Sequence, residues 1–211
     1  VQYFINQYDE HTKDVLAQVI GKSWTTTVGA SLLNKVYGTD FIPVFDVQLA
    51  FPYDKKISGY SDDTVFVVTQ KLDGFRAVVE VKDGKVLSIK TRKGKIIDGL
   101  SELKADIERV VDANLGHFIY DGELLLEDPE NQWTSGERFQ KTGQMISADG
   151  ESIGLGYNIF DALPYAEFVA GKSKLPYIAR RKNYLETFTA GNLVRAIPVL
   201  GTADKAGIPA W

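Results

Sequence analysis

Residues 64–81 read TVFVVTQKLDGFRAVVEV, a charged centre between two runs in which apolar residues alternate with other types. Lys71, Asp73 and Arg76 surround Gly74 in this centre. An Asp-Gly pair between alternating strands predicts a hairpin turn. From the residues alone a turn is favoured over a reaction site, and the choice between them decides how the chain folds here.

The composition is that of an ordinary globular protein. The chain has 211 residues, of which 44% are hydrophobic, which is enough for one domain with a substantial core and a small appendage. No apolar run approaches the roughly 20 residues that cross a bilayer, and the first residues lack the pattern of a secretion signal. We therefore expect a soluble, cytoplasmic protein with no membrane partner.

Several kinds of site are excluded by residue counts. Cysteine is absent, which excludes disulfides, thiolate zinc sites and cysteine nucleophiles. His11 and His117 are the two histidines, too few for a histidine metal cluster, and His117 precedes an apolar strand, where a structural role is favoured. The net charge of -4 argues against a surface that is basic throughout, so any contact with nucleic acid must be local.

The first 38 residues predict helices. Residues 12–22 have apolar positions at helical spacing, and residues 29–38 predict a second short helix that ends at Gly38. The segment is small for a domain and the chain opens with Val. We therefore expect a fragment of a longer protein.

From Phe41 onward the pattern changes to short β-branched and alternating runs, which predict a mainly antiparallel sheet with inserted helices, an α+β fold. Ser101 is the expected N-cap of one helix, and Gly191 the expected end of another. Residues 130–144 predict either a helix over the sheet or a loop. The predicted strands span residues 41–51, 64–72, 75–92, 117–127, 156–164 and 192–201, and the predicted helices span 98–114 and 175–191.

Two further Asp-Gly pairs allow a comparison within the sequence. Asp83-Gly84 has only charge and alternation around it, which predicts a plain hairpin turn within residues 75–92. Asp121-Gly122 interrupts a strong strand, where a glycine indicates a bulge or a close approach by backbone or ligand. Glu123 then lies in an apolar stretch, where a carboxylate needs a metal, a cation or a hydrogen-bond donor.

Asp73-Gly74 differs because cationic side chains flank its turn. On alternating strands, Lys71 and Asp73 point to one face. A lysine is a nucleophile only after it loses its proton, which burial, neighbouring cations or a metal promote. Arg76 supplies a planar fork that suits phosphate oxygens.

Four motifs in order resemble the covalent nucleotidyltransferases: ATP-dependent DNA ligases, RNA ligases and messenger-RNA capping enzymes. They are KLDGFR at 71–76, TRKG at 91–94, YDGELLL at 120–126 and NIFDAL at 158–163. Within this group the chain is most similar to phage-type ATP-dependent DNA ligases, from residue 28 onward. The resemblance implies an ATP-grasp-like nucleotidyltransferase domain over residues 39–211, preceded by residues 1–38 as the end of a helical DNA-binding region.

Roles follow as what this resemblance implies. Lys71 becomes adenylated by ATP, Arg76 and Arg92 hold the ribose or phosphates, and Glu123 contacts the ribose or a divalent metal, Mg²⁺. Phe160 stacks on the adenine, although its ring also suits core packing. The nucleotide-binding residues implied are Thr69, Gln70, Lys71, Leu72, Arg76, Arg92, Glu123 and Phe160.

The implied substrate is nicked double-stranded DNA, bound by a monomer. Two basic clusters, residues 90–95 and 180–182, give limited support for a DNA partner. The sequence departs from the family in two ways: Thr69 replaces a glutamate that is common two residues before the lysine, and the chain ends before the next motif. We therefore expect a nucleotidyltransferase domain that is incomplete at its carboxyl end, lacks an OB-fold domain and does not ligate by itself.

Two alternatives stay open. An RNA ligase or a capping guanylyltransferase shares the lysine motif and is separated by its preference for ATP or GTP. A noncatalytic nucleic-acid-binding fragment, in which residues 71–76 form only a hairpin, predicts that Lys71→Ala changes no chemistry.

Overall fold

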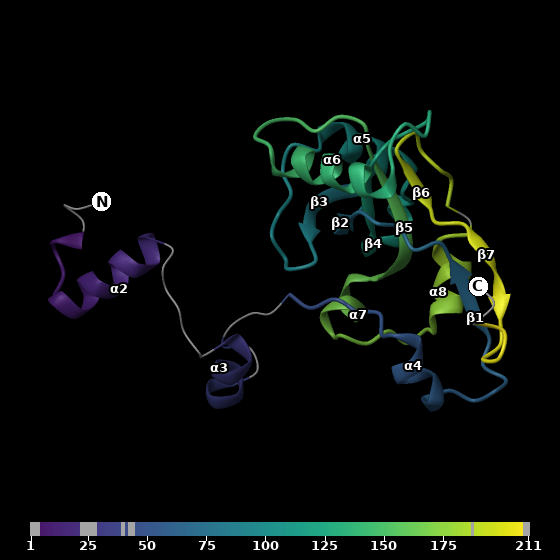
Figure 1. Ribbon diagram of the computed structural model, residues 1–211, viewed down its shortest axis with the longest axis horizontal. Helices are drawn as coiled ribbons and strands as arrows, with labels where there is room; N and C mark the ends of the chain where they lie inside the picture. Colours follow the sequence, from purple (N-terminus) through teal and green to yellow (C-terminus); the bar gives the residue numbers. More distant parts are fainter. Residues whose placement is uncertain (1–4, 22–28, 39–40, 42–44, 187, 209–211) are drawn as a thin grey trace. The chain divides into compact units, whose positions relative to one another are not determined.

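The computed structural model describes residues 5–21, 29–38, 41, 45–186 and 188–208. It divides the chain into two compact units, residues 1–44 and 45–211. In the first unit, α2 spans Glu10–Ile20 and α3 spans Ala30–Tyr37 (Figure 1). Asp9 caps α2 by accepting a hydrogen bond from the Thr12 N–H at 3.1 Å, and Gly38 follows α3, so both predicted helices are confirmed.

The second unit is built on a five-stranded sheet with the order β3-β2-β4-β5-β6. Neighbouring strands are antiparallel except for β5 and β6, which are parallel. This mixed, mainly antiparallel sheet with flanking helices confirms the α+β class. The strands are β2 Phe75–Lys82, β3 Lys85–Thr91, β4 His117–Leu126, β5 Leu155–Pro164 and β6 Val194–Ala196.

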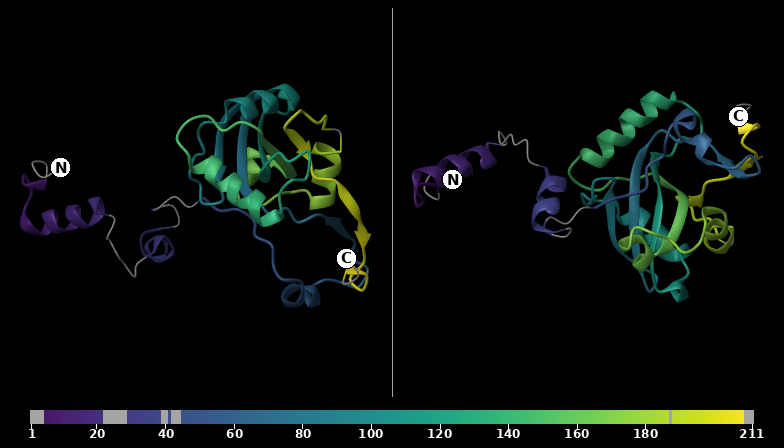
Figure 2. Two further views of the ribbon diagram at one scale, coloured as in Figure 1. Left: turned by 45° about the horizontal axis from the view of Figure 1, so that its top comes forward. Right: turned by 90° about the horizontal axis from the view of Figure 1, so that it is seen from below.

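The two faces of the sheet bury different clusters because successive side chains of a strand point to opposite sides. On β2, Ala77 and Val79 join the main core, while Val78 joins a smaller cluster with Phe168. Helices α5, Ser101–Val110, and α6, Ser135–Ser147, cover the main core, and Figure 2 shows α6 lying along one side of the sheet. The remaining helices near the sheet are α7 Tyr165–Val169, α8 Tyr177–Tyr184 and the 3-10 helix η2 Ala113–Leu115.

A separate two-stranded antiparallel sheet pairs β1, Phe66–Thr69, with β7, Val199–Ala203. Figure 1 shows the two strands side by side, close to α4, Tyr53–Lys56. The 3-10 helix η1, Ile57–Gly59, follows α4. No described helix has the length and apolar composition that a membrane crossing requires.

Asp83-Gly84 forms a turn in the structure, whereas Asp121-Gly122 lies inside a strand. Asp83 and Gly84 both have positive φ angles, 50° and 76°, and join β2 to β3 as the predicted hairpin turn. A Cβ added at Gly122 would meet the Asn158 carbonyl oxygen at 2.5 Å and the Tyr157 ring at 2.7 Å, so the predicted close approach is confirmed. The register also shifts here, but the extra residue lies on the facing strand β5 and not on β4.

The hairpin prediction for residues 71–76 is wrong. The strands on either side of Lys71, β1 and β2, do not pair with each other, because β1 pairs with β7 and β2 pairs with β3 and β4. Residues 70–74 therefore form a passage between two sheets.

Two predicted helix boundaries are also wrong. Ser101 is the first residue of α5 and not its N-cap, since its N–H and hydroxyl both donate to the remote carboxylate of Glu151, at 3.0 and 2.9 Å. Helix α8 ends at Tyr184, not at Gly191. The Gly191 N–H instead donates to the Val194 carbonyl at 2.6 Å, in the turn that leads into β6.

Two predicted strands differ from the structure. The prediction for residues 192–201 covers two strands of different sheets, β6 and β7, because Pro198 between them has no N–H for a ladder. The strand predicted over 41–51 is absent from described residues 45–51, where Phe45 and Val47 pack against the second face of the sheet instead of pairing. Residues 42–44 lie outside the described residues.

Candidate active site

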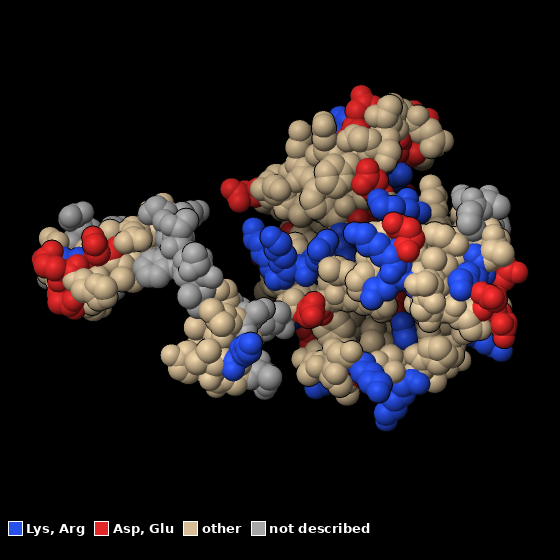
Figure 3. Space-filling view, turned by 60° about the horizontal axis from the view of Figure 1, so that its bottom comes forward, with Lys and Arg blue, Asp and Glu red and all other residues tan. Residues whose placement is uncertain are grey.

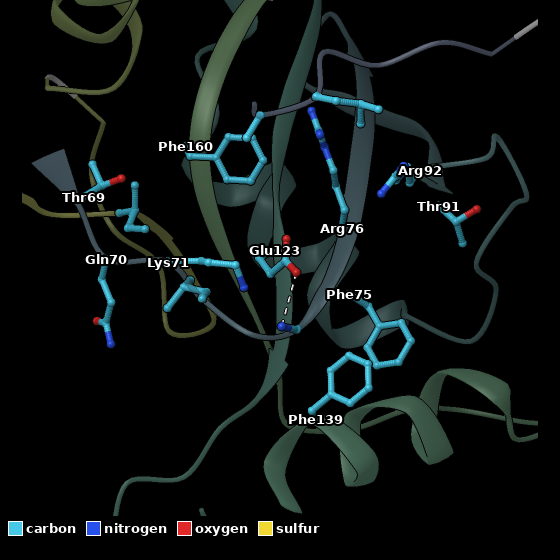
Figure 4. A pocket seen from close by; sticks show the side chains of 15 residues that line it. Thr69, Gln70, Lys71, Phe75, Arg76, Thr91, Arg92, Glu123, Phe139 and Phe160 are labelled. Carbon is cyan, nitrogen blue, oxygen red and sulfur yellow. Dashed lines mark hydrogen bonds between the residues drawn. The ribbon is translucent and has the colours of Figure 1, made fainter. Parts of the chain in front are cut away.

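A cavity of about 790 Å³ opens where the passage between the sheets crosses the large sheet. Its walls come from elements that are far apart in the sequence. Lys71 comes from the passage, Arg76 from β2, Glu123 from β4 and Phe160 from β5 (Figure 4). The lining residues are Leu49, Ala50, Thr69, Gln70, Lys71, Leu72, Gly74, Phe75, Arg76, Thr91, Arg92, Glu123, Phe139, Phe160 and Ile197.

Lys71 belongs to the passage, and Glu123 belongs to the neighbouring strand β4. Figure 4 shows the Lys71 side chain reaching into the cavity towards Glu123. The Glu123 carboxylate accepts a hydrogen bond from the Gly74 N–H at 3.2 Å, the contact that the figure marks. This bond fixes the passage against β4 at a point three residues from Lys71. It also supplies the hydrogen-bond donor that a carboxylate in an apolar strand needs.

Arg76 is held firmly rather than left free. Its Nε and Nη2 donate to the Asp121 carboxylate at 2.9 and 2.5 Å, and its Nη1 donates to the Gln48 carbonyl at 2.6 Å. Its guanidinium also lies 5.3 Å from the centre of the Phe160 ring. The side chain is 17% exposed, so it keeps one face open to the cavity while its charge is paired behind.

The electrostatics of the site reflect burial. Burial raises the pKa of Glu123 above its usual value, and the Gly74 N–H and the charges of Arg76 and Lys71 oppose the rise. Burial also raises the pKa of Asp121, against the opposing effect of Arg76. For Arg76, burial works to lower the pKa, but the hydrogen bonds and charge of Asp121 outweigh it and the pKa lies above its usual value.

All eight nucleotide-binding residues predicted from the sequence line this one cavity. The set comprises Thr69, Gln70, Lys71, Leu72, Arg76, Arg92, Glu123 and Phe160. Asp73 is not among the lining residues; its carboxylate lies 3.5 Å from the Ser135 hydroxyl at the start of α6. The prediction that Lys71 and Asp73 share a face fails because the passage is not a strand.

Sequence reasoning missed several lining residues. Thr91 belonged to the quoted TRKG motif, and its hydroxyl accepts a hydrogen bond from the Lys95 N–H at 3.2 Å, which shapes the turn that carries Arg92. Phe139 and Ile197 had no signal, because an apolar residue in a cavity wall resembles a core residue in the sequence. Residues 130–144, left open between helix and loop, contain the start of α6, which carries Phe139.

The two predicted basic clusters differ in their exposure to solvent. Arg92 and Lys93 are exposed on the turn after β3, and Figure 3 shows Lys and Arg side chains gathered in a band across one face of the molecule. Arg180 and Arg181 are buried, at 8% and 6% exposure. Arg180 pairs with Asp161 at 2.5 Å and Arg181 donates to the Ile197 carbonyl, so these two are unavailable to a phosphate backbone.

A magnesium ion would find few protein ligands here. Among the described residues, no three His, Asp or Glu side chains are grouped to hold a metal. Of the residues that line the cavity, Glu123 is the one that presents a carboxylate, beside Lys71. One carboxylate together with substrate phosphates is a donor set that suits Mg²⁺, so the residues fit a metal that arrives with a triphosphate.

A model of the ATP dependent DNA ligase domain matches residues 48–202, which include the cavity-lining motifs. The chain belongs to this family. The ligase domain thus covers nearly all of the second unit, and its match begins at Gln48, whose carbonyl accepts from Arg76.

Solved structures share the fold of this ligase domain. A structure named Pmar-Lig_Pre has a TM-score of 0.69 and 20% identity, covering 91% of this chain and 44% of its own. Another, Pmar-Lig_PreS3, has a TM-score of 0.65 and 19% identity, covering 87% of this chain and 42% of its own. The chain therefore spans less than half the length of either structure.

A third structure is the ATP-dependent DNA ligase from bacteriophage T7 in complex with ATP. Its TM-score is 0.45 at 13% identity, with 75% of this chain and 54% of that chain covered, which is too distant to carry an argument. A search of curated proteins found no match.

Proposed function

We propose that this chain carries the nucleotidyltransferase step of an ATP-dependent DNA ligase, with Lys71 as the residue that becomes adenylated. The observation that carries the proposal is the convergence of Lys71, Glu123, Arg76 and Phe160 on one cavity from four separate elements. A lysine, a carboxylate, a fixed positive charge and an aromatic face are the groups that this reaction needs.

In the proposed step the Lys71 ammonium first gives up one proton to solvent, and the neutral amine attacks the α-phosphorus of ATP. The P–N bond forms as the bond from the α-phosphorus to the bridging oxygen breaks, pyrophosphate leaves with that oxygen, and the nitrogen gives its second proton to solvent. Covalent catalysis divides a difficult condensation into easier steps. Gly74, held by Glu123, keeps the passage that carries Lys71 in place for the attack.

The remaining cavity residues would bind and orient the nucleotide. Phe160 offers a ring face to the adenine, and Thr69, Gln70 and Leu72 line the cavity beside it. Arg76 and Arg92 would contact the ribose or phosphates. Glu123 would contact the ribose or hold Mg²⁺, which supplies charge neutralisation for the triphosphate when bound.

The later steps belong to the proposal as well. AMP would pass from Lys71 to the 5'-phosphate of a nick, and the 3'-hydroxyl would then displace it and form the phosphodiester. Nicked double-stranded DNA is the proposed partner of a monomeric protein, with roles in DNA repair, replication and recombination. Residues 1–38 would belong to the end of a helical DNA-binding region, and residues 39–211 to the nucleotidyltransferase domain.

The test is a pair of labelling reactions with Mg²⁺ and ATP that carries radioactive phosphorus at either the α or the γ position. We expect the chain to retain the α label and not the γ label. The retained label should be released by mild acid and resist alkali, because it is held by a P–N bond. Retention of the γ label would contradict the proposal, and retention from GTP instead of ATP would favour a capping guanylyltransferase.

A further inference from the structure

The cavity wall at Phe160 and Ile197 lies where the large sheet is broken twice. On β5 the register passes from Ile159, opposite Gly122, to Asp161, opposite Asp121, so Phe160 is the extra residue of a bulge. Ile197 lies between the end of β6 and the start of β7, where the chain leaves one sheet for the other. A bulge and a strand break each leave backbone groups without ladder partners.

Helix α8 supplies the missing partners. The Tyr177 hydroxyl donates to the Phe160 carbonyl at 3.1 Å, and Arg181 donates through Nη2 to the Ile197 carbonyl. Nη1 of Arg181 also lies 3.5 Å from the Tyr177 hydroxyl oxygen. Tyr177 and Arg181, one helical turn apart, therefore join the backbones of two cavity-lining residues through one connected set of hydrogen bonds.

The burial of Arg181 costs more free energy than a purely structural contact would require. It is 6% exposed, and among the described residues its Nε finds no hydrogen-bond partner and its charge finds no ion pair. Burying a charge that has no counter-ion costs free energy, which an apolar side chain of similar volume would not. Arg180, the next residue back, differs because its charge is neutralised by Asp161.

We propose that Tyr177 and Arg181 are positioning residues that hold the wall formed by Phe160 and Ile197 in the shape that receives the purine base. This inference rests on the proposed function, in which Phe160 contacts the base. Lys71 and Glu123 come from other elements, and within the described part of the chain no hydrogen bond joins them to this pair. The pair therefore governs nucleotide binding and leaves the attack itself unchanged.

The test compares Tyr177→Phe and Arg181→Met with the wild-type chain. Tyr177→Phe keeps the ring and removes only the hydroxyl, and Arg181→Met keeps the volume and removes the donors. For each, the rate of AMP attachment to Lys71 is measured against ATP concentration, and the thermal unfolding midpoint is measured in parallel. We expect the ATP concentration for half-maximal rate to rise about tenfold or more, while the maximal rate stays within about twofold.

Two further variants separate positioning from stability. Leu185 directly follows α8, and Leu185→Ala removes a core side chain that is 2% exposed. It should lower the unfolding midpoint and keep the wild-type ATP dependence. Arg181→Lys retains a donor that reaches one carbonyl, so its ATP dependence should fall between those of the wild type and Arg181→Met.

The outcomes distinguish this inference from the proposed function. A labelled wild-type chain whose Tyr177→Phe and Arg181→Met variants keep the wild-type ATP dependence would overturn the inference alone. A lower unfolding midpoint without a shift in ATP dependence would likewise reduce the pair to structural support. If the wild-type chain neither binds ATP nor becomes labelled, the proposed function fails, and the inference falls with it.

Discussion

At the scale of single residues, Glu123 shows how a sequence position and its chemistry connect. A carboxylate in an apolar strand needs a partner, and the structure provides the Gly74 N–H together with the nearby charges of Lys71 and Arg76. These partners do not fully offset burial, since the pKa of Glu123 remains raised. Glu123 is therefore kept at a cost in stability, which is typical of a functional site.

Glu123→Gln should raise the thermal unfolding midpoint at pH 7, because the amide keeps an acceptor for Gly74 and has no ionisation cost. A raised pKa in the folded state means that protonation stabilises the fold, so the wild type gains stability as the pH falls through the folded pKa towards the ordinary carboxyl value. The difference between variant and wild type should then shrink below about pH 4.5. Glu186→Gln, at an exposed position, is the control. An unfolding midpoint at pH 7 that stays unchanged or falls would contradict this account.

At the scale of elements, Asp106 fastens β6 to α5. Its carboxylate accepts from the Leu193 and Val194 N–H groups at 2.7 and 3.1 Å, and from Arg109 at 2.5 Å. Burial works to raise the pKa of Asp106, but these donors prevail and the pKa lies below its usual value. The short strand β6 therefore depends on a helix that lies almost 90 residues earlier in the sequence, a separation that the Asp106–Leu193 bond spans.

Asp106→Asn should destabilise the fold by about 2–4 kcal/mol at pH 7, because an amide cannot accept from three donors and places its own N–H groups against them. Because the pKa of Asp106 is lowered in the folded state, its charge stabilises the fold at a pH above the pKa of the unfolded state. This stabilisation is lost as the pH falls through the pKa of the folded state. The deficit of the variant should therefore narrow below about pH 4. Chemical denaturation at pH 7 and at a pH below about 4 measures this deficit in the free energy of unfolding, with Asp98→Asn at an exposed position as the control. A deficit that is equal at both pH values would show that the charge of Asp106 contributes nothing.

The elements that the sequence predicted well are those with local signals. The hairpin of β2 and β3 follows from alternation around Asp83-Gly84, and the close approach at Gly122 follows from a glycine inside a strong strand. The passage at 70–74 could not be separated from a hairpin by local pattern, because long-range pairing with β7 decides it. The same holds for Arg180 and Arg181, which resemble a basic surface cluster until their partners on other elements are known.

The candidate site was predictable where a motif carries it. Lys71, Arg92, Glu123 and Phe160 belong to quoted motifs and line one cavity, although their roles stay predictions. Tyr177 and Arg181 had no such signal. Their importance depends on which carbonyls lose ladder partners, and only the register of the sheet reveals that.

At the scale of the whole molecule, the basic band in Figure 3 is the surface that a phosphate backbone would follow. Arg92, Lys93 and Lys95 are exposed members of the predicted cluster, on the turn beside the cavity. The proposed DNA partner would therefore reach the nucleotide site past this turn.

The triple variant Arg92→Ala, Lys93→Ala and Lys95→Ala should weaken binding to nicked DNA at all sequences. The slope of the logarithm of affinity against the logarithm of salt concentration should fall by about one unit for each phosphate that the variant no longer neutralises. Fluorescence anisotropy at several salt concentrations measures both quantities. The control removes the same number of charges, at Lys82, Lys104 and Lys172, which do not line the cavity. An equal weakening in the control would attribute binding to net charge alone.

The central claim is that Lys71 forms a covalent bond to AMP, and the intact mass of the protein tests it most directly. The wild-type chain, Lys71→Ala and the control Lys82→Ala are each weighed before and after incubation with Mg²⁺ and either ATP or GTP. We predict a gain of one adenylyl group from ATP in the wild type and in Lys82→Ala, and no gain in Lys71→Ala. A gain that survives in Lys71→Ala, a guanylyl group in place of the adenylyl group, or no gain in the wild-type chain would contradict the claim.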